Sequence, residues 1–178
     1  MPRKLLNIEL GRISAEEYRA LPGSGVAVVL DNVRSAHNVG SAFRSSDAFR
    51  VDKVLLCGIS AVPPSAEIHK SALGAELSVP FVHYDDTLEA VRALREEGYV
   101  VVSVEQTVDS VKLDSFVPAP DVRYAFVFGN EVDGVRQDVV DASDFTLEIP
   151  QHGTKHSLNV SVSVGIILWA WAAGSKSL

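Results

Sequence analysis

Three clusters of polar residues and glycines each follow a stretch that the sequence pattern predicts to be a buried strand. They occupy residues 30–44, 128–135 and 149–159. Open α/β sheets bind their ligands at the carboxyl ends of their strands. A glycine after a strand more often belongs to an ordinary turn, so no single cluster is specific evidence. Three clusters at one edge of a sheet predict a binding site there.

Taken in order, the three clusters resemble the conserved motifs of the SpoU/TrmH-type RNA 2′-O-ribose methyltransferases of the SPOUT superfamily. The segment NVGSAFR at 38–44 is similar to the family's first motif, N-x-G-x-x-x-R. The segment FGNEVDGV at 128–135 is similar to the second, F-G-x-E-x-x-G. Ile149-Pro150, followed by SLNVSV at 157–162, is similar to the third. The resemblance covers roughly residues 24–173.

The resemblance implies a fold, a cofactor and partners. The implied fold is an α/β fold whose mostly parallel sheet carries helices on both faces, with a C-terminal deep trefoil knot. Knots are otherwise essentially absent from proteins, so no pattern in the residues predicts one. The resemblance also implies S-adenosyl-L-methionine bound in the knot and an RNA substrate. It further implies a homodimer formed through the C-terminal helix region, with the active site near the subunit interface.

By this resemblance, Arg44 is the residue nearest to methyl transfer. The reaction needs a ribose 2′-OH aligned with the sulfonium methyl group, and it must remove the hydroxyl proton. A guanidinium stays charged and accepts protons poorly, so we expect Arg44 to hold the target phosphate and stabilise the developing alkoxide. Arg44 acts as a base only if it is strongly perturbed or relayed through phosphate. The alternative is a surface ion pair with Asp47 at i,i+3.

The resemblance assigns catalytic roles to four further residues. Asn38 contacts RNA or orients Arg44, and it could equally be a helix N-cap. Glu131 organises the site through hydrogen bonds, with a solvated loop carboxylate as the alternative. Ser157 and Asn159 position the substrate or the cofactor loop.

Cofactor contacts in the family are largely made by backbone groups from three loops. Gly129 is the best-supported individual residue, because close approach to a ligand needs a position without Cβ. Ile149 and Leu158 are expected to pack on the adenine, although each could be ordinary core. The complete predicted set is Val104, Gln106, Gly129, Asn130, Ile149, Ser157 and Leu158.

The predicted RNA contacts are mostly basic residues near the first and third clusters. Phosphate groups attract such side chains, which fix the position of the RNA. The set is Arg34, His37, Asn38, Arg44 and Lys155. His152 and His156 have the i,i+4 spacing of a metal pair, but no third ligand lies nearby in the sequence, so we expect no metal site.

Short apolar runs alternate with helical stretches, the pattern of an α/β sheet with parallel pairs. The predicted strands are 26–30, 53–57, 100–104 and 125–128, with weaker candidates at 80–84 and 145–149. The predicted helices are 35–49, 67–73, 87–98 and 135–142.

The segment 157–173 supports two interpretations. Leu158 to Val164 alternates between apolar and polar residues, which slightly favours a strand in the first half. The resemblance implies instead that 158–172 is a helix, buried both in the fold and against a partner. A helix that packs only within its own chain is the alternative.

Composition limits the remaining possibilities. The chain has 178 residues, 47% of them hydrophobic, which predicts one catalytic domain over 1–178 with a short N-terminal extension at 1–23. The single cysteine excludes a disulfide framework. No signal-peptide core and no long apolar run is present, so we expect a cytoplasmic protein without a membrane span.

The formal net charge of −7 argues against a protein held on nucleic acid by bulk charge alone. Residues 85–115 carry eight acidic and three basic residues, whereas 31–53 carry three acidic and four basic ones. A neutral-to-basic face away from the acidic segment is therefore compatible with RNA binding.

These observations predict a methyltransferase acting on ribose 2′-OH groups of RNA, with tRNA favoured over rRNA because no recruiting domain is evident. Residues 1–23 carry only a small excess of basic residues, so the substrate could be recruited by an accessory protein. The main alternative is a non-catalytic RNA-binding protein that retains the knotted fold. A nucleotide-binding α/β protein is a third possibility, but its usual G-x-G-x-x-G signature after the first strand is absent.

Overall fold

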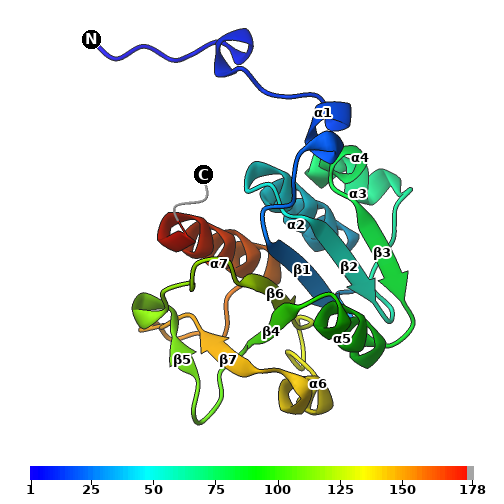
Figure 1. The fold of residues 1–178 in the computed structure, drawn as a ribbon, viewed down its shortest axis with the longest axis vertical. Helices are drawn as coiled ribbons and strands as arrows, with labels where there is room; N and C mark the ends of the chain where they lie inside the picture. Colours follow the sequence, from blue (N-terminus) through cyan, green and yellow to red (C-terminus); the bar gives the residue numbers. More distant parts are fainter. Residues whose placement is uncertain (176–178) are drawn as a thin grey trace.

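A computed structural model describes residues 1–175 and contains one seven-stranded sheet (Figure 1). The strand order is β3-β2-β1-β6-β4-β7-β5, and every pair of neighbours is parallel. The strands are β1 (Val26–Asp31), β2 (Lys53–Cys57), β3 (Phe81–Tyr84), β4 (Tyr99–Val104), β5 (Val111–Lys112), β6 (Arg123–Phe128) and β7 (Phe145–Glu148). The six strands predicted from the sequence are all present, and the two-residue β5 was not predicted.

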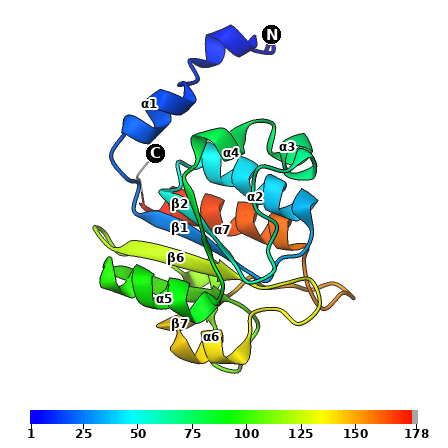
Figure 2. The ribbon, with the colours of Figure 1, turned by 90° about the vertical axis from the view of Figure 1, so that its right-hand side faces the viewer.

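Helices cover both faces of the sheet (Figure 2). The α-helices are α1 (Ala15–Ala20), α2 (Ala36–Ala48), α3 (Ala66–Ala72), α4 (Ala75–Ser78), α5 (Thr87–Glu96), α6 (Gln137–Ala142) and α7 (Val160–Ser175); two 3₁₀ turns are η1 (Asn7–Leu10) and η2 (Leu113–Ser115). One core joins the sheet to α2, α3, α4 and α7, and a second core joins it to α5 and α6. The predicted α/β class is confirmed.

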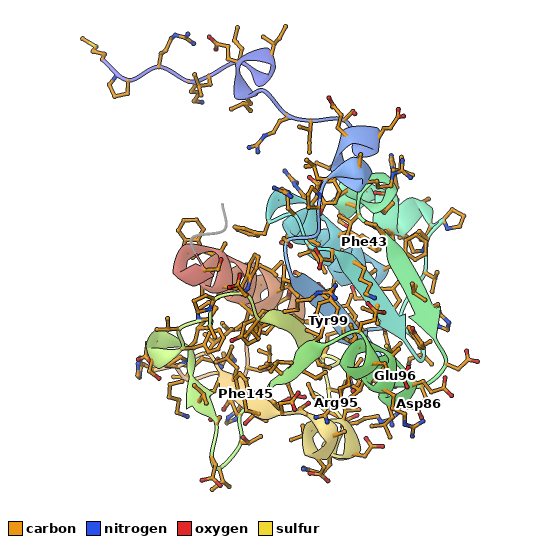
Figure 3. The ribbon with its side chains drawn as sticks, in the orientation of Figure 1. Phe43, Asp86, Arg95, Glu96, Tyr99 and Phe145 are labelled. Atoms are coloured by element: carbon orange, nitrogen blue, oxygen red, sulfur yellow. The ribbon has the colours of Figure 1, made fainter. Side chains whose placement is uncertain are left out.

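The central strands are buried because helices cover them on both sides. All six residues of β1 are buried, as are the last five of β6. This explains why these strands are continuous apolar runs without the alternation of a half-exposed sheet. On the α2 face, Phe43 packs edge-to-face on Phe81 at a centroid distance of 5.8 Å (Phe43 is labelled in Figure 3).

Helix α2 begins with Ser35 as its N-cap, whose Oγ accepts a hydrogen bond from the backbone N–H of Asn38 at 3.3 Å. The alternative of Asn38 as the N-cap is therefore wrong, because Asn38 lies inside the first turn. Gly40 lies where α2 meets α3, and a Cβ there would be 2.4 Å from the carbonyl oxygen of Ile68. The glycine of the first motif therefore allows two helices to pack closely.

Helix α7 contradicts the strand interpretation of the segment that begins at 157. Residues 157–159 have no regular structure, and the helix runs from Val160 to Ser175. Val160 and Val164 share one side of the helix with Ile167 and are buried in the α2-side core. The alternation of valine and serine along 160–164 is thus compatible with a helix. The burial of one side of this helix decided between the strand and the helix interpretations. The helix implied by the resemblance is confirmed.

Residues 1–14 extend away from the sheet and its helices (Figure 1). The chain joins the body at α1, where the Tyr18 hydroxyl donates to the carbonyl oxygen of Val51 at 2.9 Å. The assignment of 1–23 as a short extension of a single catalytic domain stays a prediction. Among the helices in residues 1–175, none is long and apolar enough to span a membrane.

Candidate active site

A pocket of about 540 Å³ opens at the carboxyl ends of β4, β6 and β7. All seven residues predicted to contact the cofactor line it, namely Val104, Gln106, Gly129, Asn130, Ile149, Ser157 and Leu158. Three predicted catalytic residues, Glu131, Ser157 and Asn159, also line the pocket. The fold therefore brings the second and third polar clusters together around one cavity.

A chain of hydrogen bonds connects the first cluster to the other two. The Asn38 side chain donates from Nδ2 to Glu131 Oε1 at 2.7 Å. Its Oδ1 accepts a hydrogen bond from Asn159 Nδ2 at 3.2 Å. Asn38 is 8% exposed, so its amide needs both partners. Asn38, which is 93 positions from Glu131 and 121 from Asn159 in the sequence, thus fixes the relative placement of α2, the β6 loop and α7.

Asn159 has a second role at the start of α7. Its Oδ1 accepts from the backbone N–H of Ser161 at 2.9 Å and from the Ser161 hydroxyl at 2.7 Å. These bonds satisfy an otherwise unpaired amide at the helix N-terminus. The sequence analysis did not predict this capping role, although an asparagine before an apolar helical run is a typical N-cap.

The Asn38–Glu131 hydrogen bond predicts a pH-dependent loss of stability in Asn38→Asp. The new carboxylate would face Glu131 and raise the pKa of one of the two groups in the folded state. A raised folded-state pKa means that stability is present below the unfolded-state pKa and is lost as the pH rises through the folded-state value. We expect a deficit of about 1–2 kcal/mol at pH 7.5 that shrinks towards pH 4.5.

Urea unfolding at both pH values measures this deficit. Asn38→Leu is the matched control, because it removes the same hydrogen bonds without adding charge. Its deficit should not depend on pH. An equal pH response in the two variants would show that Glu131 does not face residue 38.

The loop after β6 is closed on itself by backbone hydrogen bonds. Asn130 and Gly134 exchange two N–H···O bonds of 3.2 Å each, and Asn130 Oδ1 accepts from the N–H groups of Val132 and Asp133. A Cβ on Gly129 would lie 1.9 Å from the carbonyl carbon of Gly134. The absence of a side chain at 129 is therefore required by the loop itself, in addition to the close approach of the cofactor that the sequence predicts.

Two carboxylates outside the predicted set accept hydrogen bonds from backbone N–H groups at the end of this loop. Glu105 Oε2 accepts from the N–H of Val135 at 3.0 Å, and buried Asp31 Oδ2 accepts from the N–H of Arg136 at 3.0 Å. Asp31 Oδ1 accepts from the Thr87 hydroxyl at 2.5 Å. Asp31 is the last residue of β1 and Glu105 directly follows β4, and this position at the carboxyl end of a strand was the available signal for them. We infer that Asp31 and Glu105 position the pocket wall.

The lining of the pocket is negatively charged. Glu105, Glu131, Asp133 and Glu148 all line it, and no lysine or arginine among residues 1–175 does. Glu148 is ion-paired with Lys112, and hydrogen bonds from Lys112 and Ser110 lower its pKa, so the negative charge of the pocket comes mainly from the other three carboxylates. Such a lining attracts a ligand that carries positive charge and repels phosphate groups.

The 149–159 loop forms the outer wall of the pocket. Gln106 Nε2 donates to the carbonyl oxygen of His156 at 2.7 Å, which connects this loop to the end of β4. His156 also lines the pocket. Within the described part of the chain, no group of three His, Cys, Asp or Glu side chains is placed to hold a metal ion.

The predicted RNA contacts lie outside the pocket lining. Arg34, Arg44 and Lys155 are exposed, and none forms an ion pair or side-chain hydrogen bond with any residue in 1–175. The alternative of an Arg44–Asp47 pair is therefore wrong. These cations remain available for phosphate groups. Helix α5, with Asp86 and Glu96 at its ends, begins the acidic segment 85–115 and packs on the opposite face of the sheet (Figure 3).

The model of the SpoU rRNA Methylase family matches residues 25–169, which contain the pocket and all three clusters. The chain belongs to the SpoU rRNA methylase family. The resemblance inferred from the three motifs is confirmed.

The chain has relatives named 23S rRNA (guanosine-2′-O-)-methyltransferase RlmB. The one from Nitrosomonas europaea is 38% identical over 146 residues, covering 80% of this chain and 54% of that protein. The one from Vibrio cholerae is 34% identical and covers 94% of this chain and 64% of that protein. The chain thus spans between about half and two thirds of the length of these curated relatives.

Solved structures of SpoU-type enzymes share the fold. An AdoMet-bound rRNA methyltransferase from Sinorhizobium meliloti superposes with a TM-score of 0.78 at 25% identity, covering 88% of this chain and 59% of that chain. AviRb from Streptomyces viridochromogenes, in complex with AdoMet, gives 0.73 at 25% identity, covering 86% of this chain and 62% of that chain. The knot implied by the resemblance stays a prediction for this chain.

Proposed function

We propose that the chain transfers a methyl group from S-adenosyl-L-methionine to a ribose 2′-OH of RNA. The observation that carries the proposal is the acidic pocket, which is bounded by two family motifs and connected to the third by Asn38. A sulfonium and an α-ammonium group are both positively charged, so they suit a lining of four carboxylates. Two of the matched structures, the Sinorhizobium meliloti enzyme and AviRb, are complexes with AdoMet.

The cofactor would supply the electrophilic methyl group, and the residues of the chain would place the hydroxyl. Arg44 would hold the target phosphate and stabilise the alkoxide as it forms, because a guanidinium is a fixed cation with paired donors. Asn38, held between Glu131 and Asn159, would fix the helix that carries Arg44 relative to the pocket. Ser157 and Lys155 would contact the substrate from the pocket's outer wall.

We propose rRNA as the substrate class. The RlmB relatives, which are 31–38% identical, are named for 23S rRNA and for guanosine. Because of these names, we propose rRNA in place of the tRNA that the lack of an evident recruiting domain had favoured. The names also favour an enzyme over a non-catalytic RNA-binding protein. The need for an accessory protein stays a prediction.

We propose that the enzyme is a homodimer formed through α7. Val162, Ile166 and Trp169 lie along one side of the helix, opposite the buried side, and Val162 and Trp169 are 48% and 63% exposed. Trp169 contacts Phe49 from the end of α2, with ring centroids 6.3 Å apart. A helix that is apolar on both sides needs a second apolar surface, and a second copy would provide it.

We expect Trp169→Glu to convert this dimer to monomers. Placing a charge in the apolar contact leaves it unpaired on association. Sedimentation equilibrium at micromolar concentration measures the mass of each variant. Val108→Glu is the control, because Val108 is fully exposed on a distant loop and should leave the dimer intact. A monomeric unsubstituted chain would contradict the proposal.

The function is tested by incubating the protein with labelled S-adenosyl-L-methionine and unmodified rRNA or tRNA, followed by nucleoside analysis. A 2′-O-methylated nucleoside from rRNA is the expected result. Transfer to tRNA alone would overturn the substrate class. If the cofactor does not bind, the pocket assignment is wrong.

A further inference from the structure

A second cavity, of about 590 Å³, lies between α3, α4 and the first residue of β3. We call it the α3–α4 pocket. Its apolar walls are Pro63, Pro64, Ala66, Leu77 and Phe81. None of its residues lines the candidate active site or belongs to the three motifs. It is therefore a separate feature that the proposed chemistry does not explain.

The α3–α4 pocket contains one buried carboxylate. The Glu76 side chain is 8% exposed, and its Oε1 lies 2.5 Å from His69 Nδ1. Its Oε2 is buried and has no hydrogen-bond partner in the described chain. A buried acceptor without a donor is costly, and such groups are rare in folded proteins. Because Glu76 lines the pocket, a ligand bound there could supply the missing donor.

The contact of His69 with Oε1 of Glu76 can be exchanged for another donor. The His69 side chain is 64% exposed, and ion pairs with exposed partners contribute little to stability. A ligand that offers two N–H groups could therefore replace the imidazole and pair with both oxygens of Glu76. Paired, parallel hydrogen bonds to a carboxylate are short and directional.

We propose that the α3–α4 pocket binds a guanine base of the substrate RNA, outside the methylated nucleotide. Guanine presents N1–H and the N2 amino group side by side, which matches the two oxygens of a carboxylate. Its flat rings suit the walls formed by Pro64, Leu77 and Phe81, since bases stack on apolar and aromatic side chains. Adenine has an acceptor at N1 and would leave Glu76 unpaired.

The position of the pocket favours RNA over other sources of such a group, and this step rests on the proposed function. Pro63 and Pro64 lie in the segment that connects β2 to α3, and the first residue of α3, Ala66, also lines the pocket. Helix α3 packs on α2, the helix whose first turn contains His37, and a Cβ on Gly40 of α2 would lie 2.4 Å from the carbonyl oxygen of Ile68. RNA that contacts His37 and Arg34 would thus lie beside the pocket.

Nuclear magnetic resonance titration of the full chain tests the binding chemistry. Guanosine should shift the amide signals of Ala66 and Leu77, inosine should bind more weakly because it lacks the amino group, and adenosine should not shift them. Glu76→Gln should weaken guanosine binding about tenfold or more. Leu77→Arg should block the pocket, whereas Leu73→Arg should not, because Leu73 is equally exposed but lies outside the lining.

Binding of a 23S rRNA fragment tests the source of the base. Glu76→Gln and Leu77→Arg should raise its Kd, and Leu73→Arg should not. Equal shifts by adenosine or by arginine amide, no shift by guanosine, or an unchanged Kd would each overturn the proposal. A cofactor titration followed at Gly129 and Asn130 in the same sample tests the proposed function separately.

Discussion

Replacing Arg44 by alanine should reduce methyl transfer by about 1000-fold or more while leaving cofactor binding and folding unchanged. Arg44 is exposed, does not line the pocket and forms no ion pair with the described residues, so its removal breaks no contact of the folded chain. The whole effect should therefore appear in the chemical step and in RNA placement. Single-turnover transfer from labelled cofactor measures the rate of methyl transfer. Calorimetric titration of the cofactor measures its Kd, which should be unchanged.

Arg92→Ala is the matched control for this experiment. Arg92 is another exposed arginine without an ion pair in the described chain, but it lies on α5, which packs on the opposite face of the sheet. It should retain full activity. Arg44→Lys separates charge from geometry, because lysine keeps the charge but cannot make paired hydrogen bonds to phosphate. Normal turnover by Arg44→Ala would remove this residue from its proposed role.

Gly129→Ala should abolish cofactor binding with the fold largely retained. The added Cβ would lie 1.9 Å from the carbonyl carbon of Gly134 and 2.0 Å from the backbone nitrogen of Val135. Both neighbours are backbone atoms, so the loop must move as a unit and lose its bonds to Asn130 and Glu105. A displacement of about 1 Å can cost on the order of 100-fold in a site that depends on placement. Overpacking should also cost about 1–3 kcal/mol of stability.

Gly153→Ala is the control for the second experiment. Gly153 lies in the 149–159 loop beside the same pocket, and a Cβ there has nothing within 4 Å. Cofactor affinity and the urea midpoint of this variant should match those of the unsubstituted chain. If Gly129→Ala binds the cofactor normally, the closed form of the loop is not needed for binding.

These two residues illustrate different limits of sequence reasoning. The motif placed Arg44 in the site but left open an ion pair with Asp47, and only the structure shows that this pair does not form. The motif also selected Gly129, and the close approach of the cofactor inferred from the sequence stays a prediction, to which the structure adds the contact with Gly134. Contact between the backbone at 129 and 134 depends on the exact path of the loop, which residue types alone do not specify.

No local sequence pattern predicts the role of several residues described above. Asp31 ends β1 and Glu105 directly follows β4, and their carboxylates accept hydrogen bonds from the N–H groups of residues 136 and 135 only because β6 lies between those strands. Glu76 in the α3–α4 pocket carries no motif. Its significance comes from burial, which requires the packing of α3, α4 and β3 to be known.

The sequence by itself determined the class of fold, the family and the edge of the sheet that carries the site. Continuous apolar runs specify strands covered on both faces, and motif spacing specifies the order of the three loops. The tertiary structure decided the helical state of 160–164, the hydrogen bonds from Glu131 through Asn38 to Asn159, and the unpaired state of Arg44. These depend on contacts between residues far apart in the chain, and the alternation of valine and serine was overridden because one side of α7 is buried against α2 and the sheet.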